Sequence, residues 1–186
     1  MESDLPKLIA ANKALSPIKG EERWLTGYTD ASYKIEPPGQ GGGYGLWVRD
    51  SHTRILRSGP CPDWVACSND AELCGVFAAI HTAMTRLHSE WANIMVIKTD
   101  SQAVARWFGW RSPRTSIPRT PERLDLVVRG LEAATSRGIR LVVTWVKGHR
   151  GKRDTSAYLN TMVDKLAGEA RISREHNAFE KLIKEN

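Results

Sequence analysis

The N-terminal part of the chain carries the apolar pattern of β-strands, after a short helical candidate over Leu5–Leu15. Strands are predicted over three segments separated by glycine-rich, proline-rich or polar turns: Leu25–Thr29, Tyr44–Val48 and Thr53–Ser58. The last two flank the polar tetrapeptide Arg49–His52, which is typical of a hairpin. The chain is therefore expected to open with three antiparallel strands.

Helix and strand patterns alternate in the rest of the chain. Apolar residues at helical spacing between Leu73 and Leu87 predict a helix that Ser68 or Asn69 would cap. Further helices are expected over Ser101–Phe108, Glu122–Arg137 and Leu159–Ile172, and further strands over Ile94–Thr99 and Leu141–Val146. This order predicts an α/β fold with a five-stranded mixed sheet. Strands 1–3 are expected to be antiparallel and strands 4–5 parallel, with helices on both faces.

Length and composition suit one folded domain with two shorter terminal segments. The chain has 186 residues, of which 41% are hydrophobic, enough for a core of ordinary size. We expect an N-terminal extension over residues 1–22, the domain over 23–172 and a charged C-terminal tail over 173–186. No apolar run reaches membrane-spanning length, and the first residues lack a signal-peptide pattern. We therefore expect a monomer in the cytoplasm.

The charge balance and the cysteines narrow the class of protein further. Lys and Arg number 27 against 21 Asp and Glu, which gives a net charge of +6 and favours a polyanionic partner, most commonly nucleic acid. The irregular spacing of Cys61, Cys67 and Cys74 predicts free thiols and argues against a disulfide framework or a zinc site.

Four carboxylates occupy positions where chemistry gathers in α/β folds. Asp30 and Asp100 each directly follow an apolar strand, and functional groups collect beyond strand ends. Glu72 lies in the first turn of a predicted helix, and Asp164 shares a helix face with Asn160, four residues earlier. Each acid alone has an ordinary interpretation, as a turn residue, a helix-end charge or a half-exposed helical acid.

Together the four acids predict a metal site. Carboxylates that converge on one sheet edge repel each other unless cations neutralise them, and hard oxygen ligands select Mg²⁺, with Mn²⁺ as the alternative. Two such ions about 4 Å apart form the clamp used in phosphodiester cleavage.

Five motifs, read in order, resemble a ribonuclease H of type I: YTDAS, SNDAEL, TDSQAV, WVKGH and NTMVDKLA. The resemblance extends from about Trp24 to Arg171. It implies the ribonuclease H-like fold and an endoribonuclease that hydrolyses the RNA strand of RNA–DNA hybrids. The products would carry 5′-phosphate and 3′-hydroxyl ends.

The resemblance also implies roles for single residues. Asp30 would bridge two metal ions, Glu72 and Asp100 would complete the shell of one, and Asp164 would join Asp30 on the other. His149 in WVKGH matches the family's mobile histidine, which is thought to assist proton transfer or product release. A simple phosphate contact is the competing role for His149.

Substrate contacts follow from the same comparison. Asn69 and Gln102 match polar residues that touch the minor groove and sugar edges of the hybrid, and Ser32 would join them. Asn160, in NTMVDKLA, is a further substrate-binding candidate, and Arg150 and Lys152, beside His149, are candidates for phosphate contacts. A second basic cluster is expected to supply phosphate contacts from about half of its members: Arg106, Arg111, Arg114, Arg119 and Arg123. Trp107 is expected in the core.

Three departures from the family pattern concern substrate binding. Ala31 stands where Gly is usual, and Glu36-Pro37-Pro38 replaces an Asn-Pro turn that touches substrate in the family. Cys67 stands where a phosphate-binding Thr is common. Two other functions stay open on the residues: a DNA nuclease of the same superfamily, such as a junction resolvase or integrase-like enzyme, and a non-catalytic nucleic-acid-binding module.

Overall fold

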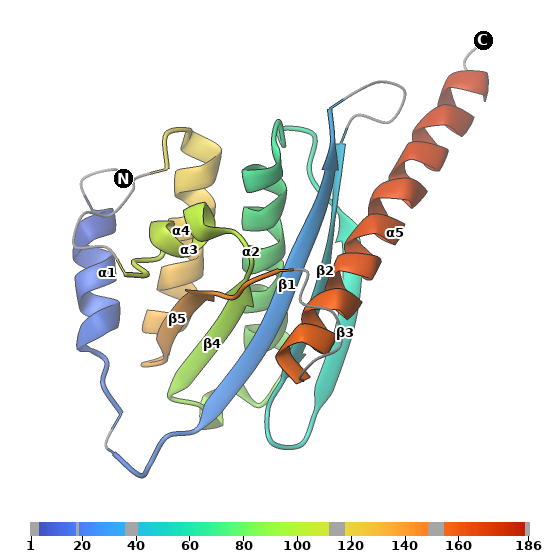
Figure 1. Ribbon diagram of the computed structural model, residues 1–186. Helices are drawn as coiled ribbons and strands as arrows, with labels where there is room; N and C mark the ends of the chain where they lie inside the picture. The colour runs from blue at the N-terminus through green and yellow to red at the C-terminus, as the bar shows by residue number, and fades with distance from the viewer. Residues whose placement is uncertain (1–3, 18, 36–40, 112–117, 149–154, 185–186) are drawn as a thin grey trace.

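The computed structural model describes residues 4–17, 19–35, 41–111, 118–148 and 155–184 of the chain, with side chains as far as Ser173 (Figure 1). Its five strands form one sheet in the order β3-β2-β1-β4-β5. The strands are β1 (Trp24–Lys34), β2 (Gly41–Arg49), β3 (Arg54–Pro60), β4 (Ile94–Thr99) and β5 (Arg140–Trp145). β1, β2 and β3 pair antiparallel, whereas β4 pairs parallel with both β1 and β5. The predicted five-stranded mixed sheet is therefore confirmed.

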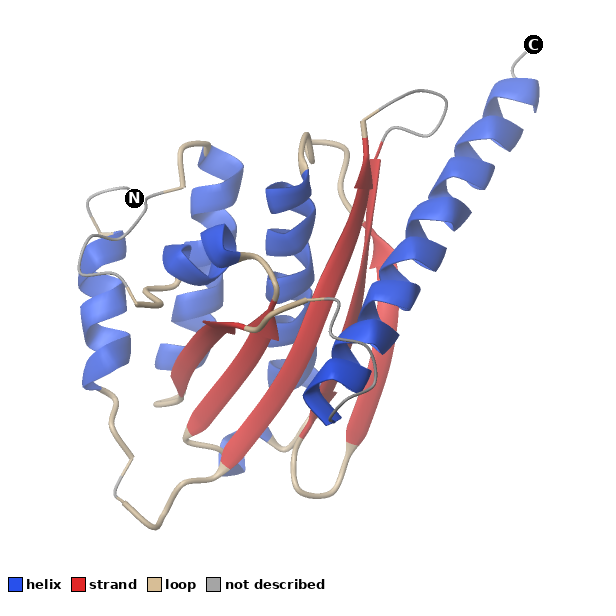
Figure 2. Cartoon of the chain, in the orientation of Figure 1, coloured by secondary structure: helices blue, strands red, loops and turns tan. Residues whose placement is uncertain are grey.

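Helices cover both faces of this sheet, as predicted (Figures 1 and 2). They are α1 (Leu5–Ala14), α2 (Ser68–Arg86), the short 3₁₀ helix η1 (Ser89–Trp91), α3 (Gln102–Trp107), α4 (Pro121–Thr135) and α5 (Thr155–Lys184). Helix α2 packs on β1 and β2 from one side and against α4 behind it, while α5 crosses β1, β2 and β3 on the other side. No helix among the described residues is long and apolar enough to cross a membrane.

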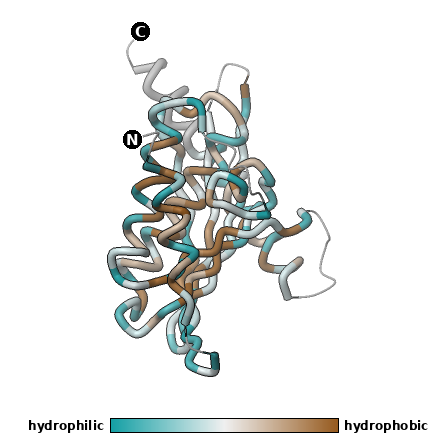
Figure 3. Tube along the Cα trace, turned by 90° about the vertical axis from the view of Figure 1, so that its left-hand side faces the viewer, coloured by the Kyte–Doolittle hydropathy of each residue, from teal (hydrophilic) through white to brown (hydrophobic). Residues whose placement is uncertain are grey.

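Glycines allow α5 to lie directly on the sheet. A Cβ added to Gly45 on β2 would collide with the backbone carbonyl oxygen of Val163, and one on Gly43 with the backbone at Arg171. Alternate residues of β2, such as Leu46, point to the opposite face and are buried under α2. Figure 3 shows the resulting pattern, with apolar segments through the middle of the molecule and polar ones at the loops.

Two local predictions are wrong. Helix α5 continues to Lys184, beyond the predicted end at Ile172, because the polar sequence after Ile172 contains neither glycine nor proline to stop it. Neither Ser68 nor Asn69 caps α2: Cys67 occupies the N-cap position and makes no side-chain cap hydrogen bond. Instead, Oδ2 of Asp70 accepts a hydrogen bond from the backbone N–H of Ala66 at 3.0 Å, which satisfies a donor at this helix end.

The first helix, α1, belongs to the folded core. Leu5 and Ile9 are buried, and the buried Asn12 side chain pairs with the backbone of Leu141 on β5. Its Nδ2 donates to the carbonyl oxygen at 2.8 Å, and its Oδ1 accepts from the N–H at 2.8 Å. Because β5 is an edge strand, this amide satisfies backbone groups that the sheet leaves unpaired.

We expect Asn12→Ala to lower the free energy of unfolding by about 2–4 kcal/mol, because it leaves two buried backbone groups unsatisfied. Urea denaturation of the full chain measures this change. Lys7→Ala on the exposed side of the same helix is the control, with an expected change of roughly 0.5 kcal/mol or less. Equal effects of the two variants would contradict the structural role of Asn12.

Candidate active site

Three of the predicted acids meet at one end of the sheet. Parallel pairing opposes Tyr28 on β1 to Lys98 on β4, so Asp30 and Asp100, two residues further along each strand, come side by side. Glu72 reaches them from the second turn of α2, one turn later than the sequence predicts, because the helix begins at Ser68. Each of the three residues offers a carboxylate oxygen that lies within 4.8 Å of the others.

Helix α2 comes close enough for this contact because of Gly75. A Cβ at Gly75 would collide with the Thr29 hydroxyl oxygen, so only glycine permits this approach of the helix to β1. Glu72 lies three residues before Gly75 on the helix and therefore faces the same strand.

One backbone amide and one hydroxyl hold the two buried carboxylates. The N–H of Ala31 donates to Oδ1 of Asp30 at 2.8 Å and to Oε1 of Glu72 at 3.1 Å. The other Glu72 oxygen, Oε2, accepts from the hydroxyl of Thr99 at 3.2 Å. Three elements thus fix the orientation of Glu72, and β1 fixes Asp30.

Burial makes the negative charge of this cluster unfavourable. Asp30 is 3% exposed and Glu72 is 7% exposed. Burial is the main cause that raises the pKa of Asp30 from its ordinary value of 3.8 to about 7. Repulsion from the nearby charge of Asp100 is the second cause. Burial also raises the pKa of Glu72 well above its ordinary range, with added repulsion from Asp30 and Asp100. A cation bound among the three acids would remove this cost.

The donor set fits a hard divalent cation. All three side chains offer carboxylate oxygen, the ligand type that Mg²⁺ and Mn²⁺ select. In addition, Oδ2 of Asp30 is buried and has no hydrogen-bond partner among the described residues. A buried carboxylate oxygen without a donor is costly unless a cation occupies its free side.

Asp164 and Asn160 approach this cluster from α5. Asp30 is paired with Gly45, and Gly45 packs against the backbone of Val163, so Asp164 on α5 lies on the same side of the sheet as Asp30. The charge of Asp164 adds to the burial that raises the pKa of Asp30. Asp164 does not belong to the group of oxygens within 4.8 Å of one another. Asn160, one turn earlier, is 4% exposed, and its Oδ1 also has no hydrogen-bond partner in the described chain.

Two predicted substrate residues lie close to Ser101 at the rim of the cluster. Asn69, in the first turn of α2, accepts a hydrogen bond through Oδ1 from the Ser101 hydroxyl at 3.2 Å. Gln102 follows Ser101 directly and is exposed, with its Oε1 accepting from Arg106 at 3.3 Å. The structure thus brings Asn69 and Gln102 to one polar edge beside Asp100. Ser32 lies on β1, where its hydroxyl oxygen accepts from Nε of Arg171 at 2.9 Å.

Of the other basic candidates, Arg111 and Arg119 are exposed, and the Arg111 guanidinium lies 4.8 Å from the Trp110 ring centroid. Several further predictions at this site fall outside the described residues. These are His149, Arg150 and Lys152, together with Arg114 and the turn Glu36-Pro37-Pro38. Trp107 is 6% exposed and lies in the core, as expected. The three cysteines are free thiols, also as expected.

An ion pair beside the acids was missed at the level of sequence. Asp70 is 2% exposed and accepts a hydrogen bond from Nε of Arg123 on α4, whose Nη2 contacts the Cys67 sulfur at 3.3 Å. Arg123 is therefore held by a buried carboxylate and joins α4 to the start of α2. The position of Asp70 in the first helical turn was the available signal, but only the tertiary structure supplies its partner.

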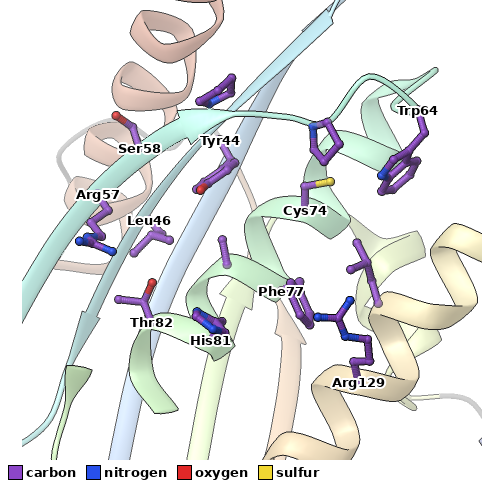
Figure 4. A pocket seen from close by; sticks show the side chains of 14 residues that line it. Tyr44, Leu46, Arg57, Ser58, Trp64, Cys74, Phe77, His81, Thr82 and Arg129 are labelled. Atoms are coloured by element: carbon purple, nitrogen blue, oxygen red, sulfur yellow. The ribbon is translucent and has the colours of Figure 1, made fainter. Parts of the chain in front are cut away.

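The cavity drawn in Figure 4 lies elsewhere. It has a volume of about 620 Å³ and opens on the α2 face between β2, β3 and α4, with Tyr44, Phe77 and Arg129 among its lining residues. The residues that line it include none of the predicted site residues. The acid cluster is therefore the candidate active site.

Solved structures with the same fold include ribonucleases H from several sources. The N-terminal RNase H domain of a Mycobacterium tuberculosis protein, solved as a fusion with maltose-binding protein, superposes with a TM-score of 0.58 at 22% identity. That match covers 84% of this chain and 99% of the other. LC11-RNase H1 in complex with an RNA/DNA hybrid gives a TM-score of 0.60 at 15% identity, covering 80% and 97%.

RNase H1 from the halophilic archaeon Halobacterium salinarum gives a TM-score of 0.52 at 21% identity, covering 79% of this chain and 96% of the other. At these identities the three structures establish a shared ribonuclease H-like fold. A search among curated proteins gives no match. The sequence model of the family described as RNase H matches residues 22–172, and the chain belongs to this family.

The raised pKa of Asp30 predicts a pH-dependent cost to stability in the metal-free protein. The folded-state pKa lies above the ordinary value of 3.8, so the folded state loses stability as the pH rises from about 4 to about 7. Asp30→Asn removes this charge. We expect it to stabilise the protein by about 1–4 kcal/mol at about pH 8 and to change little at about pH 4.

Thermal denaturation in EDTA at both pH values measures this difference. Asp125→Asn on α4 is the control, because this half-exposed carboxylate makes only a surface pair with Arg129, and we expect little change at either pH. A destabilised Asp30→Asn protein at the higher pH would refute the electrostatic account of the cluster.

Proposed function

We propose that this protein is an endoribonuclease that hydrolyses the RNA strand of RNA–DNA hybrids and leaves 5′-phosphate and 3′-hydroxyl ends. The observation that carries the proposal is the convergence of Asp30, Glu72 and Asp100, whose oxygens lie within 4.8 Å of one another, the first two buried and Asp100 half-buried. Membership of the RNase H family supports it. So does the shared fold with LC11-RNase H1, which was solved with an RNA/DNA hybrid.

In this proposal the acids hold two Mg²⁺ ions, and Mn²⁺ is the alternative. Asp30, Glu72 and Asp100 would hold one ion, and Asp164 with Asp30 the other. When bound, the ions activate a water molecule and stabilise the leaving oxygen of the phosphodiester.

The chain itself supplies the orientation of the acids. The shared Ala31 amide keeps Asp30 and Glu72 in fixed positions, and Thr99 keeps the second Glu72 oxygen turned toward the sheet. Rigid ligands of this kind keep the geometry that phosphoryl chemistry requires without reorganisation during the reaction. Within the described part of the chain, Oδ2 of Asp30 and Oδ1 of Asn160 have no hydrogen-bond partner, which supports contacts with bound ions or substrate.

The polar edge beside the acids is proposed to recognise the hybrid. Asn69, Ser101 and Gln102 present side-chain oxygens and an amide next to Asp100, and Ser32 adds a hydroxyl on β1. Short polar groups of this kind distinguish RNA from DNA through hydrogen bonds to the 2′-hydroxyl. His149 is proposed to assist proton transfer or product release, and Arg150 and Lys152 to contact phosphates, on the strength of the WVKGH motif and its basic neighbours.

We expect Asp30→Asn and Asp100→Asn each to lower hybrid cleavage by about 10³-fold or more, because each removes a ligand from the buried cluster. Gel analysis of a 5′-labelled hybrid with Mg²⁺ measures the rate and the end chemistry of the products. Asp125→Asn, which makes the same charge change at a half-exposed position on α4 away from the acids, should cleave at the normal rate.

Parallel reactions with double-stranded DNA and a branched DNA junction test the substrate. If the protein cleaves a DNA substrate and leaves the hybrid uncut, it is a DNA nuclease of the same fold. Retained hybrid cleavage in Asp30→Asn would refute the assignment of the acids. Calorimetry with Mn²⁺ then separates the chemistry from metal binding, since the proposal requires weaker binding to Asp30→Asn than to the unaltered protein.

A further inference from the structure

A second groove lies on the α5 face of the sheet, on the side of the acids that leads toward the start of β1. It has a volume of about 660 Å³ and is bounded by the first turns of α5 and by residues of β1, β2, β3 and β4. Figure 1 shows α5 beginning in front of the middle of the sheet and running toward the Lys34 end of β1. The helix therefore forms one wall of the groove, and the strands form its floor.

The strand register organises this floor into rows that cross the sheet. Asp30 on β1 is opposite Gly45 on β2, so the acids lie in a row where α5 rests on glycine. Two residues back along the strands, the pairings give a second row. Its members are Lys98, Tyr28, Trp47 and Leu56. Side chains two residues apart on a strand share a face, so this row lies about 7 Å from the acids.

The third row places two arginines directly opposite each other. Arg49 on β2 is paired with Arg54 on β3, and both side chains line the groove. Like charges directly opposite across a ladder repel each other. Neither arginine forms an ion pair with a described residue, and the lining residues of the groove include three cations and no carboxylate. This charge arrangement fits an anionic ligand.

The second row places the half-buried ring of Trp47 between the arginines and the acids, beside Tyr28, which is only 5% exposed. The rings of Tyr28 and Trp47 meet edge to face at 5.9 Å between centroids, and Nζ of Lys98 donates to the Tyr28 hydroxyl at 2.7 Å. The guanidinium of Arg49 lies 5.9 Å from the Trp47 ring centroid. Leu56 and Tyr158 at the rim are 48% and 50% exposed and add accessible apolar surface to the groove.

We propose that this groove binds a single-stranded segment of nucleic acid. Arg49 and Arg54 would contact its phosphates, and the accessible rings of Trp47 and Tyr158 would stack on its bases. Stacking on side chains requires unpaired bases, which selects a single strand over a duplex. The choice of nucleic acid as the anion rests on the proposed nuclease function, since the groove lies one row from the acids. A strand that continues beyond a hybrid at the active site would thereby gain a second binding site.

Binding of fluorescein-labelled oligothymidylate to the full chain in EDTA tests this proposal, because binding in EDTA is independent of hydrolysis. Fluorescence anisotropy at several salt concentrations gives the affinity and its salt dependence. The double variant Arg49→Ala/Arg54→Ala should bind more weakly, and the slope of log K against log salt should fall by about 1.4, the value for two phosphate contacts to a single strand. Trp47→Leu should weaken binding by about tenfold through the loss of one stacked base.

The double variant Lys7→Ala/Arg86→Ala is the matched control, because it removes the same charge from exposed positions outside the groove and should bind normally. Cleavage of a blunt hybrid should be unchanged in the arginine variant. The groove assignment would be overturned if the unaltered protein does not bind oligothymidylate. It would also be overturned if the arginine variant binds it as tightly as the unaltered protein does. Equal competition by polyglutamate would also overturn it, in favour of an acidic peptide. If the unaltered protein binds the oligonucleotide through the groove but does not cleave hybrids, the proposed catalytic function fails and the groove assignment stands.

Discussion

Mutual repulsion among buried carboxylates is the constraint on which this molecule depends. Asp30 and Glu72 are nearly inaccessible to water, and both accept a hydrogen bond from the same Ala31 amide. One amide cannot neutralise two charges, so the folded protein keeps an electrostatic cost at the end of its sheet. Such a cost is tolerated in a folded domain where a cation or a reaction uses the same charges.

The packing around the acids serves to keep them in place. Gly75 brings α2 against β1, and Gly45 brings α5 against β2, so the helices that carry Glu72 and Asp164 both rest directly on strands. The ion pair of Arg123 with Asp70 fixes α4 to the start of α2, two residues before Glu72. A larger side chain at either glycine would shift a helix and separate the ligands. The close packing of these two helices on the sheet therefore also sets the distances between the acids of the candidate site.

The face of the sheet under α5 combines opposite electrostatic environments within a short distance. The row that contains Asp30 is acidic, the next contains aromatic rings and Lys98, and the third contains Arg49 and Arg54. The rows exist because the pairing of neighbouring strands sets residues of different strands side by side across the sheet. The change of charge from row to row follows from which residues the register brings together. A polyanion that approaches the acids would meet favourable charge on this side of them, which orients its path on the protein.

The sequence by itself determined the order of the strands and helices, because apolar spacing and turn residues are local properties. It also singled out the acids through their positions after strands and in a helical turn, and the motif order identified the family. It could not show that Asp70 is the partner of Arg123, that Asn12 pairs with Leu141 or that α2 is capped without Asn69. The first two pairings join residues far apart in the chain. At the start of α2, a hydrogen bond to Asp70 takes the place of the predicted cap. Only the tertiary structure decided them, along with the rows across the sheet, because register depends on how strands pair and not on the residues of any one strand.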